Sequence, residues 1–304
     1  MIPHLRGRVD ALAEFGWTGR DAEWLALVCL HSGVFLRRQY LAFVGAPQRW
    51  RAGRLVKRCG AAAVEEPWNG TELRLCRIAA RPFYRALGAE DVRHRRLASP
   101  AVVLRRLLSL DYVLEDLDAP WLPTEAEKVA ALTAAGVPEQ VLPRRVYRGA
   151  VGSQTRYFAH KLPLALDAER ATFVFVQAED VTASAVRTWG EEHASLWAWL
   201  RESGRAVEVV VAGRDPVQLD DAGRVVDGWT QARAAVEAEP ELMAEIVAVR
   251  RAVAALDEDA LEAYGGLNGA VARCAALEAE AARSRAPRPQ ITAGRTWRSR
   301  RVPE

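Results

Sequence analysis

One stretch of the sequence, QRWRAGRLVKRCGAAAVEEPWNGTELRLCRI at residues 48–78, determines how the amino-terminal part of the chain is expected to fold. Its first half predicts a helix from Pro47 to Cys59. Proline is favoured in the first turn of a helix, where its missing N–H leaves no hydrogen bond unmade. The apolar residues recur at helical spacing and define an inward face. They are Ala52, Leu55, Val56 and Cys59.

The second half of this stretch predicts a β-hairpin. Asn69-Gly70 supplies the two positive φ angles of a type I′ turn, a strong short-range hairpin signal. A two-residue loop sets the cross-strand pairs: Trp68 with Thr71, Glu65 with Arg74, and Val64 with Leu75. An opposite-charge pair and an apolar pair both stabilise an antiparallel ladder.

Two helices are predicted before this stretch. Thr18 and Asp21 have the spacing of a capping box, which starts a helix, and Ser32-Gly33 end that helix. A second, shorter helix ends at Gly45, with apolar residues at spacings of four and three: Leu36, Tyr40 and Phe43. Three helices followed by a hairpin is the element order of a winged helix-turn-helix. In that fold the third helix enters the DNA major groove and the hairpin lies beside it.

The charges of this region favour contact with a polyanion. Between Ser32 and Gly60 there are seven positive residues and no acid, more than an exposed helix needs for solubility. The candidate DNA-binding residues are Arg37, Gln48, Arg49, Arg51, Arg54, Lys57, Arg58, Asn69 and Arg74. The central arginines of the helix are candidates for base edges or phosphates, Lys57 and Arg37 for phosphates, and Asn69 with Arg74 for the wing. A solvated face and a protein-docking module are the alternatives.

The segment from Trp17 to Leu87 also resembles a known family. Three motifs carry the resemblance: WTGRDAEWLALVCLHSG, AGRLVKRCGAAAV and RIAARPFYRALG. They are similar to the winged-helix proteins of the plasmid replication-relaxation type and to related regulators of bacterial mobile elements, whose wing ends in a short helix like Pro82–Leu87. The resemblance implies binding to double-stranded DNA in a plasmid or integrative element. It identifies no catalytic residue.

The middle of the chain, residues 97–229, predicts a small α/β domain joined by a helical connector. Helices are expected from Ser99-Pro100 and from Thr124, which has Glu127 at capping-box spacing. Strand-length runs and a helix follow, at 156–162, 171–178, 182–203 and 206–213. Strand, strand, helix, strand is also the order of a restriction-endonuclease-like core.

A nuclease site of that kind needs an Asp followed by a Glu/Asp-x-Lys on the next strand, to hold Mg²⁺ and activate water. Asp167 lies near the first position, but the run from Val176 to Asp180 is followed by no lysine at the required step. The sequence therefore favours an inactive scaffold that dimerises or senses a partner. A DNA-processing nuclease remains the alternative.

The last part, residues 230–304, predicts helices and a basic tail. Apolar residues from Leu242 to Leu256 are spaced four, three, four, three, which is a heptad seam of only two repeats that could also pack on the α/β domain. A second helical stretch, Asp259–Ala282, is interrupted at Gly265-Gly266. The tail from Arg283 has too few apolar residues to fold alone. It is expected to be flexible, either as a solubilising end or as an arm that tracks phosphates.

Composition limits the classes of protein that remain. The 304 residues are 50% apolar and 27% charged, as in a globular chain of about two domains. Residues 1–96 carry 17 basic and 9 acidic residues, 97–282 carry 18 and 29, and 283–304 carry 7 and 1. No run is long enough for a membrane span, no secretory signal is seen, and the four cysteines form no CxxC pair. P-loop, GxGxxG, GxSxG and paired-His metal motifs are absent.

Together these patterns predict an α+β protein with three parts: a winged-helix domain at residues 1–96, an α/β domain at 97–229 and a helical region with a basic tail at 230–304. The expected function is sequence-specific binding of double-stranded DNA by a homodimeric regulator or accessory factor of a bacterial mobile element. A cytoplasmic, nucleoid-associated location is expected, with no membrane contact, metal, cofactor or enzymatic activity. A nuclease and a protein-interaction adaptor are the alternatives.

Overall fold

The structure, a computed structural model, describes residues 2–45, 48–68, 73–149, 152–158, 162–178, 182–231, 240–285 and 288–303. The chain mixes helices with strands, as the predicted α+β class requires. It divides into two compact units, residues 1–230 with 291–304, and residues 231–290. No division falls at residue 96, where the sequence predicted one, and the last residues of the chain belong to the first unit.

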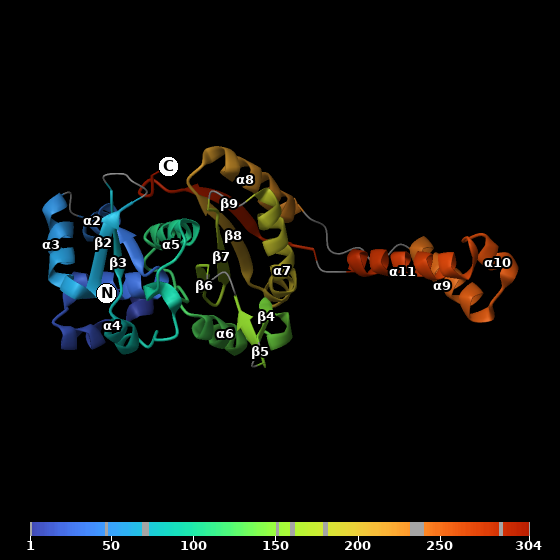
Figure 1. Ribbon diagram of the computed structural model, residues 1–304, viewed down its shortest axis with the longest axis horizontal. Helices are drawn as coiled ribbons and strands as arrows, with labels where there is room; N and C mark the ends of the chain where they lie inside the picture. The colour runs from blue at the N-terminus through green and yellow to red at the C-terminus, as the bar shows by residue number, and fades with distance from the viewer. Residues whose placement is uncertain are drawn as a thin grey trace. The chain divides into compact units, whose positions relative to one another are not determined.

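The amino-terminal part of the first unit combines helices with a three-stranded antiparallel sheet of order β1-β3-β2 (Figure 1). Its elements are α1 (Gly19–His31), β1 (Val34–Leu36), α2 (Arg37–Val44), α3 (Arg49–Cys59), β2 (Ala63–Pro67), β3 (Arg74–Ile78) and α4 (Arg81–Ala86). The three predicted helices and the two hairpin strands are confirmed, while Pro47 lies outside the described residues. Strand β1 was not predicted, because three residues are too few to show a period.

The predicted capping box at the start of α1 is wrong. Thr18 is the N-cap residue, but its side chain accepts no capping hydrogen bond. Asp21 turns instead toward the other two helices, where it accepts a hydrogen bond from the Tyr40 hydroxyl at 2.8 Å and pairs with Arg58 at 3.3 Å. The carboxylate thereby ties α1 to both α2 and α3.

The predicted hairpin register is also wrong, by two residues. Trp68 N donates to Leu73 O at 2.8 Å, Glu65 pairs with Cys76, and Arg74 pairs with Pro67. The connection is thus residues 69–72 rather than two residues, and Asn69 lies outside the described part of the chain. Strand β1 pairs along the other edge of β3 and supports this register. A shift of two keeps every side chain on its predicted face of the sheet.

The rest of the first unit is built on a four-stranded sheet of order β6-β7-β8-β9. Strands β7, β8 and β9 are parallel, and β6 is antiparallel to β7. Helix α5 covers one face, and α7 and α8 cover the other (Figure 1). The bounds are α5 (Pro100–Val113), β6 (Leu164–Leu166), β7 (Arg170–Val176), α7 (Ala183–Glu202), β8 (Ala206–Gly213), α8 (Pro216–Gln231) and β9 (Ala293–Arg298).

The predicted strand at 156–162 is replaced by two separate elements. β5 (Gly152–Tyr157) pairs with β4 (Arg144–Gly149) in a two-stranded sheet of its own, and β6 joins the main sheet. Of the predicted strand, only Arg156 and Tyr157 lie in β5, and residues 159–161 lie outside the described part of the chain. The helix predicted from Thr124 is confirmed as α6 (Glu125–Ala134), with a complete capping box: Thr124 Oγ1 accepts from Glu127 N, and Glu127 accepts from Thr124 N.

The expected flexible tail is instead the strand β9, which pairs in parallel with β8. The strand is stabilised by pairing with β8 rather than by the apolar content of its own sequence. The backbone of β9 completes the edge of β8, and Trp297 packs edge-on against Tyr112 with ring centroids 5.3 Å apart. A count of apolar residues within the segment misses both contributions.

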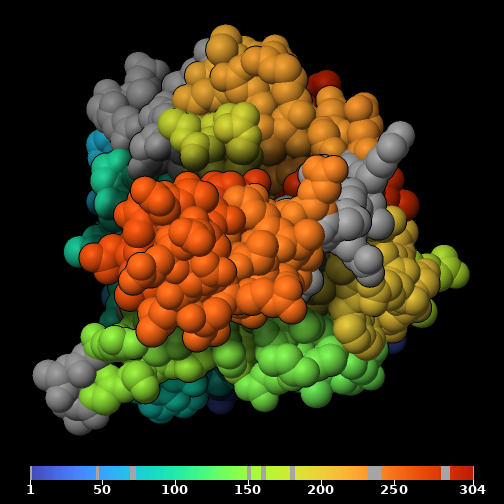
Figure 2. All heavy atoms as spheres, turned by 90° about the vertical axis from the view of Figure 1, so that its right-hand side faces the viewer, coloured from blue at the N-terminus to red at the C-terminus, as the bar shows by residue number. Residues whose placement is uncertain are grey.

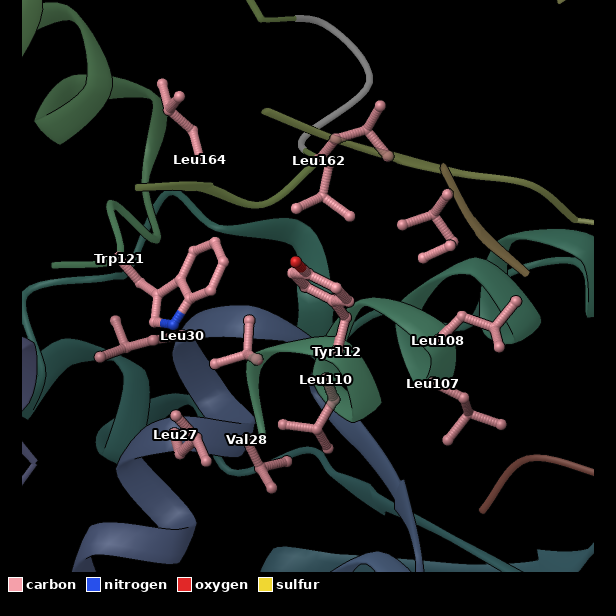
Figure 3. Packing of buried hydrophobic residues seen from close by; sticks show 14 of the residues in the cluster. Leu27, Val28, Leu30, Leu107, Leu108, Leu110, Tyr112, Trp121, Leu162 and Leu164 are labelled. Carbon is pink, nitrogen blue, oxygen red and sulfur yellow. The ribbon is translucent and has the colours of Figure 1, made fainter. Parts of the chain in front are cut away.

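A continuous hydrophobic core joins the two halves of the first unit through α5. The last seven residues of this helix, 107–113, are all buried. Figure 3 shows Leu107, Leu110 and Tyr112 of α5 between side chains of α1, such as Leu27, and side chains from the region of the main sheet. Burial on every side of a helix is typical of an enclosed position. This enclosure explains the absence of a division at residue 96.

A buried polar network crosses the same core. Asp111 of α5 is 0% exposed and accepts hydrogen bonds from Ser299 Oγ at 2.6 Å and Gln39 Nε2 at 3.2 Å. Arg301 Nη1 lies 3.3 Å from Asp111 Oδ1. Gln39 in turn accepts from Leu36 N at 3.0 Å, at the start of α2. One carboxylate therefore connects α2, α5 and the segment that follows β9.

The second unit is a helical hairpin with its own small core. It contains α9 (Pro240–Ala255), α10 (Glu258–Glu262) and α11 (Gly266–Arg285), drawn in orange in Figure 2. The predicted seam packs within the unit, where Ile246 and Val249 of α9 share a buried cluster with Leu277 of α11. The predicted break is confirmed, with φ of 79° at Gly265 and 85° at Gly266.

We expect Asp111→Ala to lower the free energy of unfolding by about 3 kcal/mol, because it leaves Ser299, Gln39 and Arg301 without their buried acceptor. Urea unfolding followed by circular dichroism measures the change. Asp118 is exposed, and Asp118→Ala is the control that should change stability by less than about 0.5 kcal/mol. Equal stability of the two variants would contradict the assigned network.

Two buried histidines predict a loss of stability in mild acid. His4 Nε2 lies 3.1 Å from His31 Nε2, and burial lowers the pKa of His4 to about 4 and the pKa of His31 well below its usual value. The unfolded chain takes up protons below about pH 6.5, while the folded chain resists them. Because both histidines contribute, the free energy of unfolding should fall by about 2 kcal/mol per pH unit between pH 6 and pH 4. Urea titrations at each pH test this, and His31→Gln should flatten the profile.

Candidate nucleic-acid interface

Helix α3 presents one apolar face and one cationic face. Ala52, Leu55 and Cys59 are buried, as the apolar spacing predicted, and Val56 is half-buried. The polar side chains of α3 and of the residue before it are exposed: Gln48, Arg49, Arg51, Arg54, Lys57 and Arg58. The buried apolar residues anchor the helix in the core, and the cations on its other face point to solvent.

Among the described residues, the central cations of this row have no acidic partner. The side chains of Arg49, Arg51, Arg54 and Lys57 form no hydrogen bond or ion pair within the described part of the chain, and Arg51 lies only over the ring of its neighbour Trp50, 5.7 Å from the centroid. Charges that are not compensated within the fold are available to an anionic ligand. We name Arg49, Arg51, Arg54 and Lys57 the α3 cationic row.

Two predicted site residues, by contrast, are held by contacts within the protein. The first is Arg58, which stacks over Trp17 at 4.1 Å, pairs with Asp21 at 3.3 Å and donates a hydrogen bond to Gly16 O. Its guanidinium fixes α3 against α1. The partners are distant in sequence, so no local pattern indicates the pairing.

Arg37, the second, joins α2 to the hairpin. Its Nε and Nη2 each donate to one oxygen of Glu65 at 2.6 Å, a bidentate pair. This pair raises the pKa of Arg37. Burial opposes ionisation of Glu65, but hydrogen bonds from Arg37 and Cys76 outweigh it and lower the pKa of Glu65. The hairpin is thereby locked to the helix that precedes α3.

The remaining predicted residue of the hairpin is Arg74, which is exposed at the first position of β3. Asn69 lies outside the described residues. Sequence reasoning missed Trp50, whose side chain is 60% exposed at the start of α3. Its position could have indicated this exposure, because Trp50 lies between Arg49 and Arg51 and outside the apolar period of the helix. Large exposed aromatic residues are enriched where proteins bind partners.

Asp167, the first position of the alternative nuclease site, accepts hydrogen bonds from the backbone around it. Its Oδ1 accepts hydrogen bonds from Glu169 N at 2.8 Å and Arg170 N at 2.6 Å, which closes the turn between β6 and β7. Glu179 and Asp180 lie outside the described residues. Within the described part of the chain, no three His, Cys, Asp or Glu side chains come together as metal ligands do.

Comparison of the chain with protein-family models, with curated proteins and with solved structures gave no match. No helix among the described residues has both the length and the apolar character needed to cross a lipid bilayer. The geometry and charge of the site are therefore the basis for assigning a function.

The two kinds of arginine predict different effects on stability. Arg37→Gln should lower the free energy of unfolding by about 1 kcal/mol, because it removes a bidentate pair that is partly exposed. Arg54→Gln should leave it within about 0.5 kcal/mol, since its side chain has no acidic partner in the part of the chain that the structure describes. Chemical denaturation of both variants measures the difference. Equal decreases would show that Arg54 also has a structural partner.

Proposed function

We propose that the protein binds double-stranded DNA in a sequence-specific manner through α3, as a transcriptional regulator or accessory factor of a bacterial mobile element. The observation that carries the proposal is the α3 cationic row, four exposed cations without an acidic partner among the described residues. Affinity for DNA comes largely from cations that neutralise backbone phosphates. Specificity for one DNA sequence comes from side chains that contact base edges.

The order of elements supports this proposal. Helix α1, strand β1, helices α2 and α3 and the β2–β3 hairpin follow one another as in a winged helix-turn-helix, in which the third helix enters the major groove. The mobile-element setting rests on the resemblance of residues 17–87 to winged-helix proteins of the replication-relaxation type. A continuous core behind α3 provides the rigid support that base readout requires.

The contacts within the protein divide the predicted residues by role. Arg51 and Arg54, near the middle of α3, are proposed to contact base edges or phosphates, and Arg49, Lys57 and Gln48 to contact the backbone around them. Arg58 and Arg37 are proposed as positioning residues, since their guanidinium groups hold α3 and the hairpin in place. The exposed side chain of Trp50 would also suit contact with a protein partner. The adaptor alternative is therefore included in the test below.

A homodimer is proposed on the second unit. Two packed helices leave apolar side chains uncovered on their outer surface: Val247, Leu267 and Val271. Pairing of two such hairpins would cover them, and a dimer places two α3 helices on two half-sites of DNA.

Selection of bound sequences from randomised duplex DNA, followed by fluorescence anisotropy, tests the function. The full chain should enrich one sequence. Arg51→Gln with Arg54→Gln should reduce the preference for that sequence by about 1–3 kcal/mol for each base edge that the variant no longer reads. Arg187→Gln, which removes an exposed charge on α7, is the matched control and should leave binding unchanged.

Two outcomes would contradict the proposal. If the chain binds no duplex, the DNA-binding assignment fails. If it binds equally well after both α3 substitutions, α3 is not the reading element. Loss of protein-partner binding on Trp50→Ala, with DNA binding absent throughout, would support the adaptor alternative.

A further inference from the structure

Trp50 lies on the side of α3 opposite the core. It precedes the buried residues of the helix, Ala52, Leu55 and Cys59, by two, five and nine positions. At about 100° per residue, these steps place Trp50 roughly 140–200° around the helix from each of them. Trp50 is 60% exposed, and Figure 1 shows α3 at the outer edge of the amino-terminal part of the first unit. Its indole ring therefore points away from the protein.

The ring of Trp50 is not used by the fold. Trp50 belongs to neither hydrophobic cluster of the described residues. Its one ring contact within the described part of the chain is with its neighbour Arg51, whose guanidinium lies over it at 5.7 Å from the centroid. The apolar faces of the ring are thus available to a ligand of α3.

Gly53 leaves free space next to Trp50, one turn further along the same helix. A glycine inside a helix lowers stability relative to alanine. A Cβ built at Gly53 would meet one described atom within 4 Å, Arg37 Nη1 at 3.9 Å, which is an ordinary contact. Packing among the described residues therefore does not require glycine at this position. Its missing side chain allows a partner to approach the backbone of α3 closely.

The cations around Trp50 indicate how a duplex would meet this surface. Arg54 and Lys57 follow Trp50 by four and seven residues, so they lie on the same face of α3. Both suit contact with the phosphates that border a groove. Trp50 is the second residue of α3, and the first residues of a groove-reading helix are those that contact base edges.

The chemistry of the ring selects one group on these edges. In the major groove the base pairs present hydrogen-bond donors and acceptors and a single kind of apolar group, the C5-methyl of thymine. Indole has a broad apolar surface and only one N–H donor. We propose that Trp50 recognises thymine by packing its ring against this methyl group, with Gly53 giving the duplex room to approach. The inference rests on the function proposed for α3 and names a base that the site reads.

Replacement of thymine by deoxyuridine tests this contact, because deoxyuridine lacks the C5-methyl group and keeps the same base pairing. Each thymine of the selected sequence is replaced in turn, and fluorescence anisotropy measures binding of the full chain. At least one replacement should weaken binding about fourfold, the effect of one methyl group that is no longer buried. In Trp50→Ala the same replacement should have no effect, whereas Trp50→Phe should retain part of it.

Tyr147→Ala is the matched control. Tyr147 is a second exposed aromatic residue, 52% exposed on β4, and its removal should leave the response to deoxyuridine unchanged. Unchanged circular dichroism and unfolding midpoint verify that the variants are folded. Gly53→Ala should raise the unfolding midpoint, because alanine is the better helix former, and yet weaken duplex binding. Unchanged affinity of that variant would overturn the close approach at Gly53.

The outcomes separate thymine recognition from DNA binding itself. If no replacement weakens binding, or if Trp50→Ala responds to it as the unmodified chain does, recognition by Trp50 is overturned. A sequence preference that depends on Arg51 and Arg54 would in that case still support the function proposed for α3. If the chain binds no duplex, both proposals fail.

Discussion

Enclosure of α5 is the constraint on which the first unit depends. The helix packs against α1 and β1 on one side and against β7 and β8 on the other, so both halves share one apolar core. Asp111 adds directional bonds to this core by holding Gln39 and Ser299 at fixed positions. The helical face of α3 and the edge of the parallel sheet consequently belong to one compact unit.

Local signals predicted most of the elements but not how distant ones pair. Caps and apolar spacing located α5, α6 and α7, and β-branched runs located β7 and β8, because these signals lie within a few residues of one another. The hairpin is flanked by β1, and the strand at 293–298 depends on β8, more than 80 residues earlier in the sequence. Pairing between strands so distant in sequence cannot be predicted from a local pattern.

The candidate site shows the same limit. The exposed row on α3 was predictable, since charge and helical period together indicate which side faces solvent. The partners of Arg37 and Arg58 were not, because Glu65 and Asp21 are 28 and 37 residues away. Trp50 was overlooked because the candidate residues were chosen for their charge and hydrogen-bonding groups. Arg58 is exposed like its neighbours on α3, so only its contacts with Trp17 and Asp21 show its structural role.

The order of the elements in the chain determines when the parallel sheet can be completed. The second unit is inserted between α8 and β9, so the edge strand leaves the ribosome only after residues 231–290 have been made. Until then β8 has an open edge and Asp111 lacks two of its partners. Completion of the first unit therefore waits until residues 231–290 have been made, and a chain that stops before Ser299 leaves the buried Asp111 carboxylate without two of its partners.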